Sequence, residues 1–170
     1  MHRAAGSLAV FPGMFDPVTH GHLDIIQRAS KLYGRLIIAV GDNPLKTQVF
    51  TPRERKAMLV EHTSDLPNVE VQIYSGLTVE FARKIGAGVI LRGIRDNVDL
   101  HAELQIATTN RIMGGVETVF LMTSGEHTLT SSTLIKQIVQ IGEYDMDNLG
   151  RLVPLDVAKR LEERLRSSKP

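Results

Sequence analysis

The stretch "LAVFPGMFDPVTHGHLDII", residues 8–26, contains a complete change of secondary structure within 19 residues. Its first four residues are an apolar run, and from about residue 22 the apolar positions recur at the three- and four-residue spacing of a helix. Between them lies a loop with glycines, prolines and two histidines. We therefore predict a strand, a ligand-accessible loop and a helix whose first turn presents unpaired backbone N–H groups, which favour an anion.

The same alternation continues along the chain. Further strands are expected at 36–42, 69–74, 88–94 and 118–123, and helices at 22–34, 53–66, 78–87, 99–115 and 131–142. Strands alternating with helices specify a parallel sheet, because parallel neighbours need right-handed crossovers that the helices supply. The predicted fold class is α/β, with a doubly wound five-stranded parallel sheet, helices on both faces and a C-terminal helix.

Two kinds of local signal support the helix boundaries. Thr51, Pro52 and Glu54 form a capping-box pattern with proline at the first helical position. Gly34, Gly86 and the pair 114–115 fall where helices are expected to end.

Composition favours one globular domain, residues 1–170, with a flexible N-terminus over 1–7 and a helical extension over 154–170. The chain is 42% hydrophobic and 23% charged, with a formal net charge of +1, so no strong field points to nucleic acid or a membrane surface. It has no cysteine, which excludes disulfides and thiolate zinc sites. No apolar run approaches the roughly 20 residues that cross a bilayer, and the expected location is the cytoplasm.

Three anion-friendly loops are expected at one edge of the sheet: 12–22, 92–96 and 124–133. The second presents Arg92 and Arg95, whose guanidinium groups match phosphate oxygens. Lys46 follows another strand. Each feature has a simpler explanation taken alone, as a cap, a surface ion pair or a solvated lysine, and their coincidence at one edge carries the functional interpretation.

Two other chemistries are disfavoured. His20 and His22 are two residues apart on a helix and face different sides, and without cysteine or an HExxH pattern they do not predict a metal site. The chain also lacks a P-loop and a GxGxxG motif after its first strand.

The segment "FPGMFDPVTHGH" resembles the G[TS]FDPxTxGH opening of the HxGH-type nucleotidylyltransferases. The segments "NPLKTQVFTPRER", "SGLTVEFARKIGA", "VILRGIRDNVD" and "SSTLIKQI" follow in the order typical of one branch, the phosphopantetheine adenylyltransferases. The resemblance covers about residues 8 to 142, and the FDPxTxGH and RGIRD blocks together make it specific.

This resemblance implies a Rossmann-like sheet, a homohexamer, and transfer of AMP from Mg²⁺-ATP to 4′-phosphopantetheine, giving dephospho-coenzyme A and pyrophosphate. Magnesium is expected mainly on the ATP phosphates. The implied catalytic residues are His22, Lys46, Arg92 and Arg95. The implied ATP site comprises Met14, Phe15, His22, Gly93, Ile94, Arg95, Glu103, His127, Thr128, Leu129, Thr130, Ser131, Ser132 and Thr133. The implied phosphopantetheine site comprises Met14, Lys46, Leu77, Thr78, Arg92, Ile106 and Asn110.

Three positions depart from the family pattern. Met14 stands where the family has Thr or Ser, and a thioether cannot donate a hydrogen bond. Ala102 replaces an aromatic residue that lines the pantetheine channel, and Thr109 lies where methionine is common. Two alternatives therefore stay open: a related transferase with another phosphate acceptor, such as nicotinamide mononucleotide or glycerol phosphate, and a nucleotide-binding regulator without turnover.

Overall fold

The computed structural model describes residues 4–42, 47–125 and 131–167, with side chains from Ser7 onward. Five strands form one sheet in the order β3-β2-β1-β4-β5, and every neighbouring pair is parallel. The strands are β1 (Ala4–Gly13), β2 (Tyr33–Gly41), β3 (Val69–Tyr74), β4 (Val89–Ile94) and β5 (Glu117–Met122). All five predicted strands are present.

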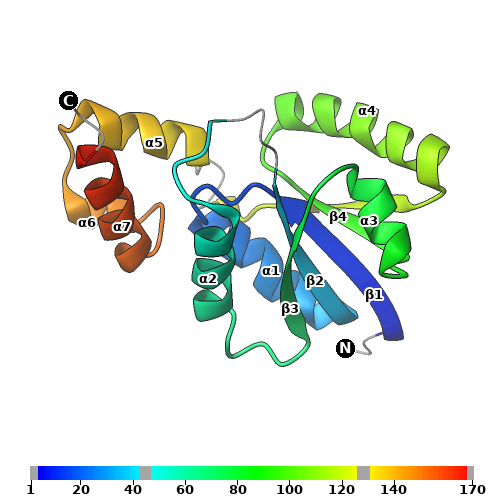
Figure 1. Ribbon diagram of the computed structural model, residues 1–170. Coiled ribbons are helices and arrows are strands. Elements are labelled where there is room, and N and C mark those ends of the chain that lie inside the picture. The colour runs from blue at the N-terminus through cyan, green and yellow to red at the C-terminus, as the bar shows by residue number, and fades with distance from the viewer. Residues whose placement is uncertain (1–3, 43–46, 126–130, 168–170) are drawn as a thin grey trace.

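Helices cover both faces of this sheet, as Figure 1 shows. The described helices are α1 (His20–Leu32), α2 (Pro52–His62), α3 (Thr78–Lys84), α4 (Asn97–Gly114), α5 (Ser132–Ile141), α6 (Met146–Gly150) and α7 (Leu155–Arg166). On one face of the sheet, α1 and α2 bury Ile25, Ile26 and Leu59 in the larger of two hydrophobic clusters. On the other face, α3 packs Val79 and Ala82 against the strands, with α4 beside it. The molecule is a doubly wound, Rossmann-like α/β structure.

The strand order fixes where a ligand can bind. The chain moves outward from β1 to β2 and β3, then crosses to the opposite side of β1 to form β4 and β5. The order therefore reverses between β1 and β4. In open α/β sheets the crevice beyond the carboxyl ends of the strands at such a reversal is the usual binding position. Loop 14–19 follows β1, and residues 95–96 follow β4.

Several boundaries differ from the sequence expectation. Strand β1 begins at Ala4, which pairs with Tyr33, earlier than the apolar run at residues 8–11 from which the strand was predicted. Gly34 lies inside β2, because the extended Tyr33 carries the chain directly from α1 into the strand without a left-handed turn. Gly86 and Gly115 do adopt positive φ at helix ends, at 70° and 66°. Helix α6, five residues long, is too short to give a periodic signal.

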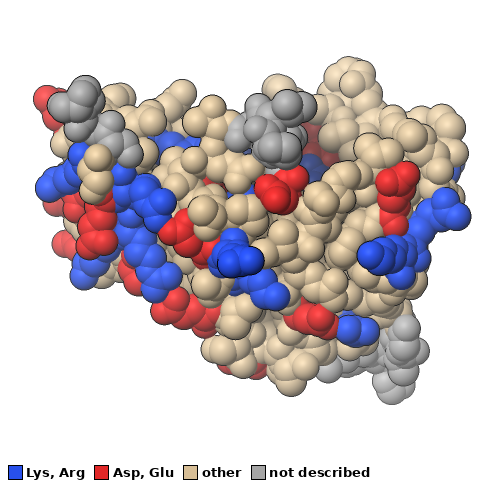
Figure 2. All heavy atoms as spheres, in the orientation of Figure 1, with Lys and Arg blue, Asp and Glu red and all other residues tan. Residues whose placement is uncertain are grey.

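The surface carries both signs of charge. On the face in Figure 2, blue and red side chains alternate over α2 and α7. Arg160 pairs with Glu61, and Arg164 pairs with Glu54. Within the described parts of the chain, no helix combines the length and apolarity needed to cross a bilayer.

Candidate active site

The first turn of α1 fixes the orientation of His22. Thr19 is the N-cap, and its Oγ1 accepts a hydrogen bond from the His22 backbone N–H at 3.3 Å. In return, His22 Nδ1 accepts from the Thr19 backbone N–H at 3.1 Å. Because Nδ1 is the acceptor, a neutral imidazole carries its proton on Nε2. His22 thus becomes a fixed donor, and its ring also packs edge-on against Phe15 with centroids 5.0 Å apart.

The surroundings of His22 keep its ring neutral. Burial, followed by the positive charges of Arg95 and Arg92, lowers the pKa of His22 to about 4. An imidazolium here would lose hydration and face two guanidinium groups at once. At neutral pH the side chain therefore offers an uncharged Nε2–H.

Arg92 lies near the end of β4 and Arg95 directly follows the strand. Carboxylates of α4 hold both side chains. Arg92 binds Glu103 through Nε at 2.7 Å and through Nη2, and its Nη1 donates to the Pro12 carbonyl at 3.0 Å. Arg95 binds Asp99 through Nε at 2.7 Å and Nη2 at 2.9 Å. These hydrogen bonds raise the pKa of Arg95 and lower that of Asp99. Planar two-point pairing fixes each guanidinium in direction as well as position.

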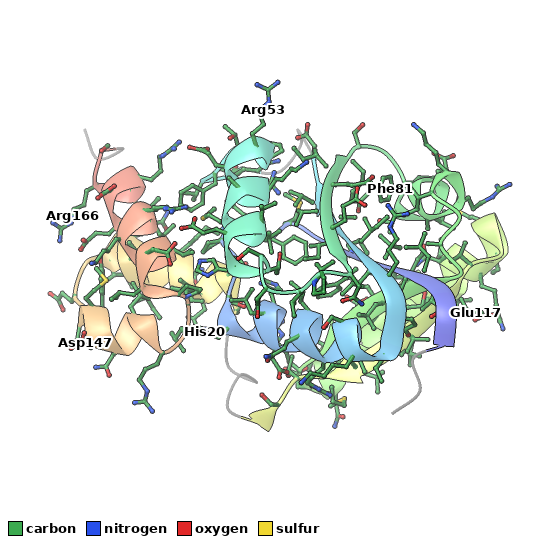
Figure 3. The ribbon with its side chains drawn as sticks, turned by 90° about the horizontal axis from the view of Figure 1, so that it is seen from below. His20, Arg53, Phe81, Glu117, Asp147 and Arg166 are labelled. Carbon is green, nitrogen blue, oxygen red and sulfur yellow. The ribbon has the colours of Figure 1, made fainter. Side chains whose placement is uncertain are left out.

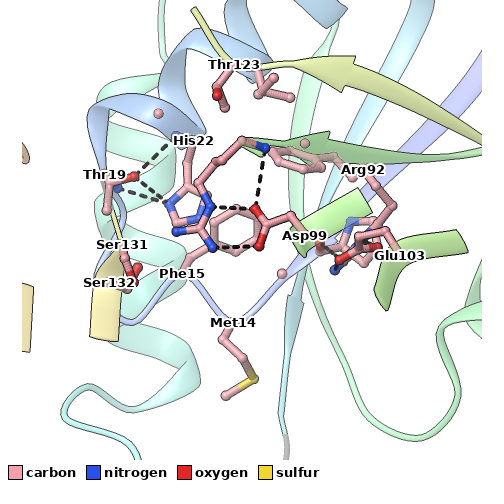
Figure 4. Close-up of a pocket in the computed structure, with 17 residues that line it drawn as sticks. Met14, Phe15, Thr19, His22, Arg92, Asp99, Glu103, Thr123, Ser131 and Ser132 are labelled. Atoms are coloured by element: carbon pink, nitrogen blue, oxygen red, sulfur yellow. Dashed lines mark hydrogen bonds and ion pairs between the residues drawn. The ribbon is translucent and has the colours of Figure 1, made fainter. Parts of the chain in front are cut away.

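One cavity is lined by all of these groups. Figure 4 shows His22, Arg92, Asp99 and Glu103 among the residues around it. It lies beyond the carboxyl ends of β1 and β4. Its described lining comprises Phe11, Pro12, Gly13, Met14, Phe15, Thr19, Gly21, His22, Ile25, Arg92, Gly93, Arg95, Asp99, Glu103, Thr123, Ser131 and Ser132. The imidazole of His22 and both guanidinium groups therefore face a shared space, which is the arrangement a polyphosphate requires.

Gly13 is needed for packing within the loop. A Cβ at this position would lie 2.8 Å from the Phe15 ring, so a side chain would displace the ring that packs against His22. The absence of a side chain at Gly13 therefore preserves the loop conformation as well as access to the backbone.

The structure places most of the nucleotide residues implied by the resemblance at this cavity. Ile94 instead points into the core and is 1% exposed, while its carbonyl accepts from the Thr123 backbone at 2.9 Å. Thr133 is exposed on α5 and does not line the cavity. Lys46, His127, Thr128, Leu129 and Thr130 lie outside the described residues.

The residues implied for the pantetheine arm do not line this cavity. Leu77 and Ile106 are exposed on the surface, by 48% and 44%. Thr78 Oγ1 is 2.7 Å from the Tyr74 hydroxyl. Asn110 is buried, and its amide donates to Thr118 on β5 at 3.5 Å.

Sequence reasoning missed three charged residues that organise the site. Asp99 could have been found, since it lies four residues after Arg95 at the start of a predicted helix. Asp16 accepts from the backbones of Val49 and Phe50 and from Lys136, and the wholly buried Arg55 binds loop carbonyls. The partners of Asp16 lie at least 33 residues away, and Arg55 also reaches the carbonyls of Met14 and Gly41, which are 41 and 14 residues away, so no local spacing could reveal these contacts.

The described residues hold no group of three or more His, Cys, Asp or Glu that could bind a metal ion. His20 turns away from His22, and its Nε2 lies 3.0 Å from the Gly150 carbonyl. Figure 4 shows His22 on the cavity side.

Comparison with known proteins identifies the family. The cytidylyltransferase-like family model matches residues 10–138. A phosphopantetheine adenylyltransferase from Synechococcus sp. (strain JA-3-3Ab) is 48% identical over 92% of this chain and 97% of its own length. One from Leuconostoc citreum (strain KM20) is 46% identical over 94% and 99%.

The solved structures extend the likeness in fold. A bifunctional NMN adenylyltransferase/ADP ribose pyrophosphatase from Francisella tularensis has a TM-score of 0.68 at 16% identity, covering 92% of this chain and 50% of that one. This likeness concerns the fold, whereas the family model and the relatives at 46% and 48% identity show that the chain belongs to the phosphopantetheine adenylyltransferase family of nucleotidylyltransferases.

Proposed function

We propose that this protein transfers AMP from Mg²⁺-ATP to 4′-phosphopantetheine, releasing pyrophosphate and forming dephospho-coenzyme A. The observation that carries the proposal is the convergence of His22, Arg92 and Arg95 on one cavity. Its relatives named phosphopantetheine adenylyltransferase, at 44% to 48% identity, support the same reaction.

The proposed reaction requires the protein mainly to position the two substrates and to stabilise developing charge. A phosphate nucleophile is already ionised at neutral pH, so no general base is required. Catalysis then consists of holding the acceptor phosphate in line with the α-phosphate and stabilising the charge that develops there. The neutral Nε2–H of His22 donates to the α-phosphate, and Arg95 holds the β- and γ-phosphates.

Arg92 binds the acceptor phosphate without leaving its partners. Described residues engage three of its five N–H groups, through Glu103 and Pro12, which leaves two for phosphate oxygens. Ser131 and Ser132 add hydroxyl groups beside the first turn of α5, where backbone N–H groups favour phosphate.

Mg²⁺ would be held mainly by the ATP phosphates rather than by the protein. Asp99 and Glu103 are the carboxylates among the described lining residues, and each is paired with an arginine, so the protein offers no dedicated cage. Mg²⁺ would neutralise phosphate charge and keep several of its waters. A chelator should therefore abolish pyrophosphate release while leaving the thermal midpoint of the ligand-free protein unchanged.

The working form is proposed to be a cytoplasmic homohexamer. Helix α4 exposes Val98, Ile112 and Met113 by 80%, 76% and 57%, an apolar surface that contact between copies would cover. Light scattering on the protein as it elutes from a size-exclusion column tests this assembly, and a monomer at micromolar concentration would contradict it.

The activity test follows pyrophosphate release from Mg²⁺-ATP with 4′-phosphopantetheine, with nicotinamide mononucleotide, with glycerol phosphate and with no acceptor. Release with 4′-phosphopantetheine alone supports the proposal. Release only with another phosphate assigns a different acceptor, and nucleotide binding without release would make the protein a regulator.

A further inference from the structure

Arg55 on α2 is a buried charge that the reaction does not itself employ. Its exposure is 0%, and burial lowers the pKa of its guanidinium. Arg53, two residues earlier on the same helix, is exposed and points away from the body of the molecule in Figure 3. Burying a guanidinium is unfavourable unless its donors are satisfied, so the partners of Arg55 indicate its purpose.

Those partners join the ends of two strands to the segment before α2. Nη1 donates to the carbonyls of Met14 and Gly41, the latter at 2.9 Å. Nε donates to the Phe50 carbonyl at 3.0 Å, and Nη2 to Gln48 Oε1 at 2.7 Å. Arg55 therefore binds the backbone just beyond β1 and at the end of β2 simultaneously.

Because Arg55 holds the Met14 carbonyl, it also fixes the direction of the Phe15 backbone N–H in the same peptide group. A trans peptide is planar, with its C=O and N–H on opposite sides, so the N–H of Phe15 points away from Arg55. Met14 and Phe15 line the cavity, and Arg55 does not. No described residue accepts a hydrogen bond from the backbone N–H of Phe15.

Phe15 is also held in an unusual conformation. Its φ is 51°, in the left-handed region that non-glycine residues rarely adopt. Such conformations cost free energy and persist only where the surroundings enforce them. The Arg55 contact on one side of this peptide, and the burial of the Phe15 ring at 2% exposure on the other, provide that enforcement.

We propose that Arg55 is a positioning residue for AMP transfer, acting through the Met14–Phe15 peptide to aim the Phe15 N–H at a nucleotide phosphate. This inference rests on the proposed function. Its importance is greater in this chain because Met14 lacks a hydroxyl donor, so the backbone N–H supplies the loop's hydrogen bond. A lysine could not replace Arg55, since an ammonium lacks the planar fork that reaches four acceptors.

The test compares Arg55→Lys with Arg53→Lys, the same substitution at an exposed position of the same helix. With both substrates saturating, kcat of Arg55→Lys should fall about 10²-fold, as when one transition-state donor is lost, while Arg53→Lys stays within about twofold. Thermal midpoints measured in parallel ensure that both variants are folded at the assay temperature. A folded Arg55→Lys protein with kcat within about threefold of the unaltered chain would overturn the proposal.

A second measurement does not depend on that variant folding. In the unaltered protein labelled with ¹⁵N, adding Mg²⁺ and α,β-methylene ATP should shift the Phe15 amide proton downfield as it binds phosphate. An unchanged Phe15 amide at nucleotide saturation would overturn the proposal. Because this readout needs binding alone, absence of pyrophosphate release with every acceptor would count against the proposed function and leave this result standing.

Discussion

At position 22 a neutral donor is better suited to the site than a third cation. Arg92 and Arg95 already supply two fixed positive charges, and another would raise the free energy of the ligand-free protein by repulsion. Their fields contribute to the pKa of about 4 at His22. The Thr19 backbone N–H donates to Nδ1, so the one N–H proton of the neutral imidazole is on Nε2. The reciprocal hydrogen bonds between Thr19 and His22, which cap α1, therefore also select the tautomer.

His22→Ala should lower turnover by about 10² to 10³, because one hydrogen bond that strengthens in the transition state is lost. Steady-state kinetics of pyrophosphate release measures this change. Gln27→Ala, at an exposed position on α1 that does not line the cavity, serves as the control and should leave kcat unchanged. Turnover near normal in His22→Ala would remove the role assigned to the imidazole.

The low pKa of His22 also predicts how stability depends on pH. Between about pH 6.5 and pH 4 the unfolded chain binds a proton at this residue more readily than the folded chain does. The stabilising contribution is therefore complete above pH 6.5 and is lost as the pH falls toward 4. Urea unfolding at pH 7 and pH 5 should show at least about 1 kcal/mol more loss in the unaltered protein than in His22→Ala. Equal losses in the two proteins would contradict the shift.

Met14→Thr tests whether the family hydroxyl is dispensable here. In Figure 4 the Met14 side chain extends away from His22, so its removal should not disturb the imidazole. A threonine adds a donor to a loop whose backbone Arg55 already holds, and we expect activity with 4′-phosphopantetheine to be equal or higher. Paired kinetics with the unaltered protein measure this, and a clear fall in kcat/KM would mean that Met14 itself serves the acceptor.

At the scale of elements, prediction succeeded where the signal is local. The five strands and helices α1 to α5 and α7 follow from periodicity, and the Thr51–Glu54 capping box is present with Pro52 at the first helical position. The cavity lining around Gly93 and Ser131 follows from strand ends meeting at one edge. What could not be predicted is of two kinds. The Asp16 and Arg55 networks depend on contacts between segments that are distant in sequence, and the five-residue helix α6 is too short to give a periodic signal.

The cap of α2 should influence the site, because this helix carries Arg55. Thr51→Ala removes the side chain that accepts from the Glu54 backbone and should lower the free energy of unfolding by about 1 kcal/mol. Ser64→Ala, which deletes an exposed hydroxyl beyond the other end of the helix, should change it by less than about 0.5 kcal/mol. Urea denaturation of both variants measures the difference, and equal effects would mean that the cap contributes nothing specific.

At the scale of the whole molecule, the C-terminal segment is part of the main core. Val157, Ala158 and Leu161 are 0% exposed and belong to the cluster that contains the α1 and α2 core residues. The segment before α7 also contacts the start of α1, since the Leu152 carbonyl accepts a hydrogen bond from the His20 backbone N–H at 3.0 Å. In Figure 1, α5, α6 and α7 gather at one end of the molecule beside α2. The expected helical extension is therefore structurally integrated with the rest of the chain.

Leu161→Ala measures that integration. If α7 shares the core, deleting this buried side chain should lower the free energy of unfolding by about 2 to 5 kcal/mol and shift a single cooperative transition. Leu155→Ala, on the same helix but 45% exposed, is the matched control and should lose much less. Urea unfolding followed by far-ultraviolet circular dichroism gives both values. A small decrease in the free energy of unfolding of Leu161→Ala, or a separate early unfolding transition for α7, would show that α7 does not share the main core. The contact between Leu152 and His20 would then not depend on α7.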